Sequence, residues 1–275
     1  MLTALTVTEK IEKNKLKHLF NIIRGNKITI TLKQSGGVTL RRLQYFNRNG
    51  KINWDIIDRY VGIQRDGILC SEYLELPADM GYRRFASEEF SKRLCTNMAL
   101  QILSKVQDAS KLKVCFYDLY GESADTLIHI LEYCPEVRVY TQNSELYSNI
   151  RDVILEDTGI SPIISCDESI LEDTDFLIAP CKIKNTLPLK NKAITLTSVC
   201  PDAGQKGALY FRYHFKMPTR FADIKPAELS DFYFATALYV KAKQHQLGTI
   251  VPMICSNYSS GARLESICAY FDSRA

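Results

Sequence analysis

The middle of the chain alternates short apolar runs with amphipathic stretches of helical period. The run at 113–118 is typical of a strand buried on both faces, and further strands are predicted at 136–141, 162–165, 176–179 and 193–197. Stretches at 123–133 and 144–156 separate the first three runs and have the polar and apolar spacing of helices. Because strands here alternate with helices, the pattern predicts a parallel sheet with both faces covered.

The first hundred residues follow a different pattern. Thr8 can cap a helix that runs to about Arg24, where the next residue is a glycine that can end it. The segment 27–33 alternates as a strand does, a glycine pair follows, and 38–46 has the pattern of a second strand. We therefore predict a hairpin in this part of the chain.

Two helices and a short strand are predicted in the rest of the first hundred residues. Asn53 is expected to cap a short helix, and 67–71 is expected to form a strand. Ser87 is expected to cap a long helix that reaches about Val106, since acidic residues fill its first turn.

The last seventy residues change pattern again. Residues 210–217 alternate large apolar side chains with Arg212, His214 and Lys216, which predicts one half-buried strand with a basic face. A helix is expected to begin at Pro226, and a last helix is expected within 261–272.

Charge divides the chain where the pattern changes. Residues 1–105 carry 18 Lys and Arg against 10 Asp and Glu, whereas residues 106–275 carry 17 against 21. A basic helix at 8–27 could contact nucleic acid, but a charged helix face is more often simply solvated, so we do not expect nucleic acid as the partner.

Composition and cysteine spacing bound the class of protein. No apolar run approaches the roughly 18 residues of a membrane span, and we predict no signal peptide. The nine cysteines are widely spaced without a C-x-x-C pair, so we predict reduced, mostly buried thiols in a cytoplasmic protein. Neither the cysteines nor the four histidines have metal-ligand spacing, and we predict no metal site.

The block 112–198 resembles the NAD(P)-binding Rossmann domain. The phrase DTDFLIAP at 173–180 is similar to the fourth strand and following loop of many dehydrogenases, and LKNKAIT at 189–195 is similar to the approach to the fifth. A preceding domain, a long linking helix and a returning tail give a layout similar to relatives of shikimate dehydrogenase and glutamyl-tRNA reductase.

The resemblance implies an α/β fold with a Rossmann-like parallel sheet, a smaller α+β N-terminal region and a helical C-terminal tail. We expect three segments: a basic region with a linker helix at 1–105, the Rossmann-like domain at 106–205, and a strand with a helical tail at 206–275. The tail is expected to pack back on the N-terminal region.

The resemblance also places a candidate cofactor site where the strands end. In the family, three glycines after the first strand let the backbone approach a pyrophosphate. This chain offers one glycine there, and acidic Glu122 and Asp125 would repel a phosphate. The residues that the resemblance assigns to a cofactor are Asp118, Tyr120, Gly121, Thr141, Gln142, Asn143, Ala179 and Pro180.

A second candidate site is the arginine pair of the loop before the long helix. Arg83 and Arg84 could clamp a phosphate or carboxylate, although paired arginines more often form surface ion pairs. His214 is a weaker candidate for acid–base chemistry. No hydrolase elbow, zincin motif or P-loop is present in the sequence.

Three functions remain open at this stage, and the least expected of them is a nucleic-acid binder that uses the basic N-terminal third. The protein could bind NAD(P) or another nucleotide through a non-standard turn, as an NAD(P)-linked oxidoreductase if it is an enzyme. The alternative is a regulatory or interaction protein without catalysis, in which only the scaffold is kept. No catalytic residue is assigned, and the ligand in either case is a small molecule or nucleotide.

Overall fold

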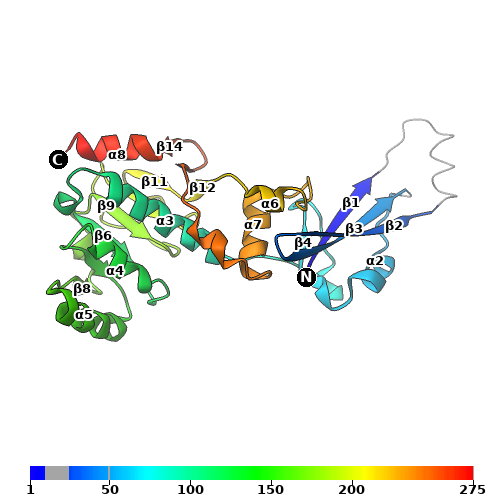
Figure 1. The fold of residues 1–275 in the computed structure, drawn as a ribbon, viewed down its shortest axis with the longest axis horizontal. Helices are drawn as coiled ribbons and strands as arrows, with labels where there is room; N and C mark the ends of the chain where they lie inside the picture. Colours follow the sequence, from blue (N-terminus) through cyan, green and yellow to red (C-terminus); the bar gives the residue numbers. More distant parts are fainter. Residues whose placement is uncertain (10–24, 49, 275) are drawn as a thin grey trace. The chain divides into compact units, whose positions relative to one another are not determined.

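The computed structural model describes residues 1–9, 25–48 and 50–274, which form two compact units. Unit 1 comprises Met1–Ser87 and Lys216–Leu247, and unit 2 comprises Glu88–Phe215 and Gly248–Ala275 (Figure 1). Each unit therefore combines two separate stretches of sequence, whereas the sequence suggested three consecutive segments.

Unit 1 is built on a five-stranded sheet with the order β2-β3-β1-β4-β5. Its strands are β1 (Leu2–Glu9), β2 (Lys27–Ser35), β3 (Val38–Asn47), β4 (Asp66–Cys70) and β5 (Arg83–Arg84). β1 lies parallel to β3 and β4, and β4 lies parallel to β5. β2 and β3 form the predicted antiparallel hairpin.

Among the described residues of unit 1, the α-helices are α2 (Trp54–Val61), α6 (Thr219–Ala222) and α7 (Asp231–Val240). The predicted cap of α2 is confirmed, because Asn53 Oδ1 accepts from Ile56 N at 3.1 Å. α7 begins later than the predicted Pro226, because Ser230 Oγ accepts from Tyr233 N and caps the helix there. Beneath α2, the core contains Leu5, Leu43, Tyr45, Ile57, Val61, Ile68, Cys70 and Tyr82.

The N-terminal strand β1 was not predicted from the sequence. Thr8, the expected helix cap, lies within β1 and pairs with Phe46 of β3. Most of the helix predicted from Thr8 to Arg24, and with it the basic cluster, lies outside the described residues. The alternation from Leu5 to Thr8 of apolar and β-branched polar residues is the signal that identifies the strand.

Unit 2 contains a six-stranded sheet in which every pair is parallel, with the order β11-β10-β9-β6-β7-β8. The strands are β6 (Val114–Tyr117), β7 (Arg138–Tyr140), β8 (Ile163–Ser165), β9 (Phe176–Ala179), β10 (Ile194–Thr197) and β11 (Ala208–Tyr210). Counted from β6, this is the Rossmann order 3-2-1-4-5-6 read from β8 to β11. The predicted α/β class with a parallel sheet and a helical C-terminal end is confirmed.

The helices of unit 2 are α3 (Glu89–Lys105), α4 (Asp125–Leu131), α5 (Ser144–Thr158) and α8 (Leu264–Asp272). α3 packs against β9, β10 and α8, while the Phe271 ring of α8 lies 5.3 Å from that of Phe176. α3 starts at Glu89 with Glu88 as its N-cap residue, one residue after the predicted cap Ser87. No helix connects β9 to β10; instead, Ile183, Leu187 and Leu189 of the connecting loop pack on the opposite face of the sheet.

The strand predicted at 210–217 is wrong as a single element. Tyr210 ends β11 in the parallel sheet, whereas β12 (Arg212–His214) pairs with β13 (Ile254–Ser256) in a separate antiparallel sheet completed by β14 (Gly261–Arg263). The chain changes partners at Phe211, whose N–H donates to Ser256 O. The expected alternation of buried and exposed side chains is nevertheless confirmed, since Tyr213 is buried and its two neighbours are exposed.

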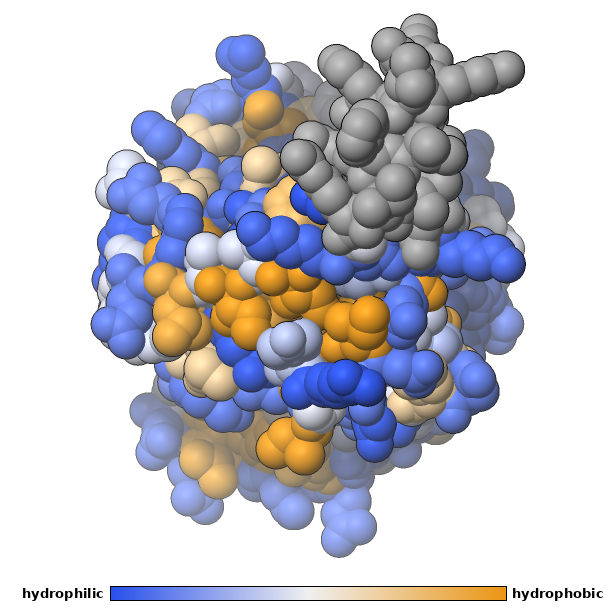
Figure 2. All heavy atoms as spheres, turned by 90° about the vertical axis from the view of Figure 1, so that its right-hand side faces the viewer, coloured by the Kyte–Doolittle hydropathy of each residue, from blue (hydrophilic) through white to orange (hydrophobic). Residues whose placement is uncertain are grey.

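Figure 2 shows a band of hydrophobic side chains framed by hydrophilic ones on one face. On β2, the last described strand of its sheet, Ile30 and Leu32 are 44% and 65% exposed, and lysines stand near both ends. Charged residues on such an edge discourage pairing with another chain. Throughout the described part of the chain, every helix is too short or too polar to traverse a bilayer.

Candidate functional site

In unit 2 the strand order reverses between β6 and β9, and an open sheet of this kind places its ligand crevice at that point. The segment 118–124 leaves β6 there and leads into α4. Pro180 follows β9 at the same edge. The sequence candidates of this unit therefore converge on one end of the sheet.

The carboxylate of Asp118 occupies the inside of the turn after β6. Its Oδ1 accepts from the backbone N–H groups of Gly121 at 3.1 Å and Glu122 at 3.2 Å. Its Oδ2 accepts from Ser123 N and from Tyr147 Oη, both at 2.8 Å. Successive N–H groups that point inward at a helix start form an anion-binding nest, and here the anion is a side chain of the same turn.

This carboxylate is removed from solvent. Asp118 is 1% exposed, and the Tyr147 ring that covers it from α5 is fully buried. Burial raises the pKa of Tyr147 far above its ordinary value, and the nearby negative charge of Asp118 raises it further. The tyrosine hydroxyl therefore stays protonated and continues to donate to Asp118.

Gly121 serves the packing of the turn. Its φ is +81°, and a Cβ placed there would come within 2.3 Å of Leu146 Cδ2 on α5. The glycine thus permits a left-handed turn and the close approach of α5. The left-handed turn and the contact with α5 both lie within the protein, so neither of them requires a ligand.

We expect Gly121→Ala to destabilise unit 2 by about 2–3 kcal/mol, because the left-handed conformation costs about 1–2 kcal/mol and Leu146 must also move. Gly159→Ala is the matched control, since Gly159 has a φ of +74° and open space around its Cβ position. Urea unfolding of both variants separates the two contributions. Equal losses of stability in the two variants would show that Leu146 moves aside without an energetic cost.

The acidic residues at the start of α4 are paired with bases of α3. Glu122 forms an ion pair with Lys92, and Asp125 Oδ2 lies 3.1 Å from Arg93 Nη1. Apart from Lys92, these side chains are well exposed, so the pairs stabilise the helix contact only weakly. The charge that the sequence placed at this helix end is therefore compensated, and Asp118 alone fills the nest.

The turn after β7 is joined to the turn after β6. Thr141 Oγ1 donates to Leu119 O at 3.3 Å and accepts from Asn143 N at 3.0 Å. Asn143 Nδ2 donates to Tyr120 O at 3.2 Å, while its Oδ1 caps α5. The side chain of Gln142 is exposed. Two of the three cofactor candidates in this turn, Thr141 and Asn143, therefore hold the turns together.

The end of β9 is buried at the switch point, since Ala179 and the following Pro180 are both buried. Cys181 is partly exposed, and its thiol donates to Tyr117 O at 3.4 Å. Burial raises the pKa of Cys181 to about 12. Cys181 is therefore a protonated, poorly nucleophilic thiol at neutral pH.

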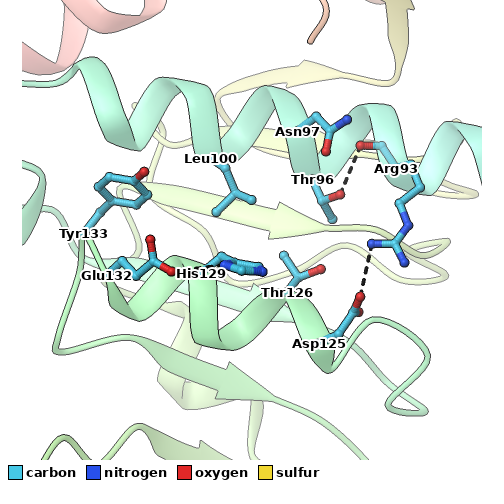
Figure 3. A pocket seen from close by; sticks show the side chains of 9 residues that line it. All are labelled: Arg93, Thr96, Asn97, Leu100, Asp125, Thr126, His129, Glu132 and Tyr133. Atoms are coloured by element: carbon cyan, nitrogen blue, oxygen red, sulfur yellow. Dashed lines mark hydrogen bonds and ion pairs between the residues drawn. The ribbon is translucent and has the colours of Figure 1, made fainter. Parts of the chain in front are cut away.

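A cavity of about 310 Å³ lies between α3 and α4 (Figure 3). Arg93 and Asp125 form an ion pair at one end, and His129 Nδ1 lies 3.1 Å from Glu132 Oε1 farther along α4. Figure 3 shows these side chains on the facing surfaces of the two helices. These charged side chains pair with one another, so this cavity is a polar groove between helices.

The two candidate arginines belong to unit 1 and have different environments. Arg83 is 77% exposed and pairs with Asp66 at 3.2 Å. Arg84 lines a cavity, and its Nη2 donates to Ser71 O at 2.9 Å and to Leu74 O at 2.7 Å. The structure therefore separates the pair and brings only Arg84 to a concave surface.

Sequence reasoning did not identify Tyr147 as the partner of Asp118. Its position in the first turn of the helix after β7 was the available signal, because that turn faces the end of β6 in a parallel sheet. Likewise, Tyr233 and Glu228, which line the cavity of Arg84, were not singled out. Within the residues described, His, Cys, Asp and Glu side chains form no group of three suited to a metal ion.

Comparison with known proteins shows distant similarity to solved dehydrogenases and reductases. The Thermococcus litoralis Δ1-pyrroline-2-carboxylate reductase, solved with NADH and L-proline, aligns over 66% of this chain and 62% of its own length, with 11% identity and a TM-score of 0.27. L-Tryptophan dehydrogenase from Nostoc punctiforme aligns over 99% and 78%, with 12% identity and a TM-score of 0.32. An archaeal alanine dehydrogenase dimer with bound NAD aligns over 71% and 67%, with 11% identity and a TM-score of 0.28.

The aligned part of this chain thus spans less than two thirds of the length of the reductase. The sequence matches no protein-family model and no curated relative. The Rossmann-like assignment rests on the strand order and parallel pairing of unit 2.

Proposed function

We propose that the protein is a regulatory or interaction protein without dehydrogenase activity, in which unit 2 is a Rossmann-like scaffold that holds no dinucleotide at the β6–α4 turn. The observation that carries the proposal is the carboxylate of Asp118 inside the nest of backbone N–H groups. The N–H groups that would bind a pyrophosphate in the related turn already have an anionic partner.

Energetics support this proposal. A pyrophosphate would have to displace a carboxylate that is attached to the same turn and therefore has a high local concentration. Displacement would also break the bond from Tyr147 and leave a charged group in a buried site. A nucleotide would gain too little at this turn to offset both costs.

The test is a thermal-shift titration of the whole chain with NAD, NADP, FAD, S-adenosylmethionine and ATP. A ligand present at 100 times its dissociation constant should stabilise the protein by about 2.7 kcal/mol. We expect no shift with any of them at about 1 mM. A saturable shift with NAD or NADP would overturn the proposal.

The second candidate function is NAD(P) binding through a non-standard turn, and the strand order of unit 2 favours it. In that case the adenine ribose would lie beside the exposed side chain of Gln142, and Asp118 would turn out of the nest. A shift with NAD(P) that Gln142→Ala reduces would support this candidate. A shift that the same substitution leaves unchanged would place the ligand elsewhere.

A further inference from the structure

Two adjoining cavities lie in unit 1 at the carboxyl ends of β1 and β4. Their volumes are about 400 and 440 Å³, and both are lined by Ser71, Tyr73 and Glu228. Carboxyl ends of parallel strands commonly form ligand crevices. Unit 1 therefore has its own candidate binding site, independent of the function proposed for unit 2.

Arg84 supplies a fixed positive charge to the first cavity. Its guanidinium is held by Ser71 O and Leu74 O, while its Nε is buried without a hydrogen-bond partner. The Cys70 thiol, a weak acceptor, lies close enough for Arg84 to lower its pKa against the larger opposing effect of burial. An N–H of an arginine that lacks a strong acceptor is a natural donor to an anionic ligand.

Tyr233 of α7 supplies a second donor in the same cavity. Its Oη is also buried without a hydrogen-bond partner. Burial raises the pKa of Tyr233 to about 12, so the hydroxyl remains protonated. Because buried polar atoms without partners are uncommon and costly, two in one cavity point to a ligand that accepts from both.

Carboxylates on the rim limit the charge of that ligand. Glu228 is fixed by Arg42 at 3.0 Å and by the hydroxyl of Thr6, and Glu72 is exposed on the loop after β4. Two negative side chains next to Arg84 disfavour a phosphate dianion. They favour a ligand that carries one carboxylate together with an ammonium group.

The second cavity has an apolar wall that suits an apolar side chain, and Glu9, Glu75 and Glu228 lie on the rest of its lining. Leu5, Val7, Ile52 and Leu74 contribute to its lining, and all four belong to or pack against the core beneath α2. The side chain of Tyr73, which is 87% exposed, stands where the two cavities meet and has room to turn aside.

We propose that this pair of cavities binds a zwitterionic amino acid with an apolar side chain. The α-carboxylate accepts from Arg84 and Tyr233, the ammonium group faces Glu72 and Glu228, and the side chain enters the second cavity. The covered donor atoms become accessible when the rim side chains, among them the exposed Tyr73, move aside.

Calorimetric and thermal-shift titrations of the whole chain with L-leucine and L-phenylalanine test the proposal. We expect binding of at least one of them at about 10 mM or below. N-Acetyl-L-leucine lacks the ammonium group and L-leucinamide lacks the carboxylate, so both are expected to bind at least tenfold more weakly. The proposal would be overturned if neither amino acid binds, or if both analogues bind as tightly as L-leucine. Binding of inorganic phosphate alone would also overturn it.

Matched variants locate the site. Tyr233→Phe removes only the hydroxyl without a partner, so its melting temperature should equal or exceed that of the native protein while affinity falls about tenfold. Tyr60→Phe, on the exposed side of α2, should leave affinity unchanged. Arg84→Lys should weaken binding more than tenfold, whereas Arg83→Lys, outside the cavity, should not. Unaltered affinity in Tyr233→Phe and Arg84→Lys would refute the assignment.

Discussion

Asp118→Asn is expected to destabilise unit 2 by about 2–4 kcal/mol. The native carboxylate accepts four hydrogen bonds, from three backbone N–H groups and from Tyr147. An amide of the same shape has one accepting oxygen, and its NH₂ group would face donors. At least one buried donor then loses its partner, and the loss of negative charge weakens the remaining bonds. Urea unfolding, followed by far-ultraviolet circular dichroism, measures the change in the free energy of unfolding.

A matched variant in the same turn shows whether burial is the cause. Asp125→Asn also removes a carboxylate at the start of α4, but that carboxylate is exposed and paired only with Arg93, so we expect a loss below about 1 kcal/mol. Tyr147→Phe should cost about 1–2 kcal/mol, and combined with Asp118→Asn it should cost less than the sum. If Asp118→Asn proves as mild as Asp125→Asn, the carboxylate does not organise the turn.

The sheet of unit 2 could be predicted from the sequence. Runs such as 114–117 and 176–179 are apolar throughout, which is typical of strands buried on both faces. Helices between the early strands then impose parallel pairing, because the connection must cross the sheet. Local pattern and global topology agree in this part of the chain.

The division into units could not be inferred in the same way. β1 pairs with β3 and β4, which are distant in sequence, and α7 joins unit 1 from beyond residue 215. Neither relation has a local signature. The segment 210–217 shows the same limit: its alternation correctly indicates which side chains are buried, but the change of sheet at Phe211 depends on the partner strand β13.

The candidate site shows why a motif can name residues without giving their roles. Asp118 and Gly121 were identified from their positions after the first strand. Their contacts depend on side-chain directions and on α5, which supplies Tyr147 and Leu146. A missing glycine pattern is visible in the sequence; an internal carboxylate that takes the place of a phosphate is visible only once the turn is built.

We expect unit 2 to lose stability steeply as the pH rises from 9 to 10. Burial raises the pKa of five of its thiols to about 12, against an ordinary value of 9.0: Cys95, Cys115, Cys134, Cys181 and Cys255. These thiols stay protonated in the folded unit, while those of the unfolded chain ionise above pH 9. The unfolded state then binds fewer protons than the folded state. The stabilising contribution of the thiols is therefore fully present below pH 9, and the free energy of unfolding falls between pH 9 and 12.

Each buried thiol contributes about 1 kcal/mol to the loss at pH 10, so five remove about 5 kcal/mol, which is comparable with the whole stability of a domain. Urea unfolding under reducing conditions at pH 8, 9 and 10 measures the slope. Cys115→Ala should make the slope shallower by about one fifth even though it lowers stability at pH 8. Cys166→Ala, which removes an exposed thiol, should leave the slope unchanged. A free energy of unfolding that stays constant from pH 8 to 10 would mean that these thiols reach solvent and ionise in the folded unit.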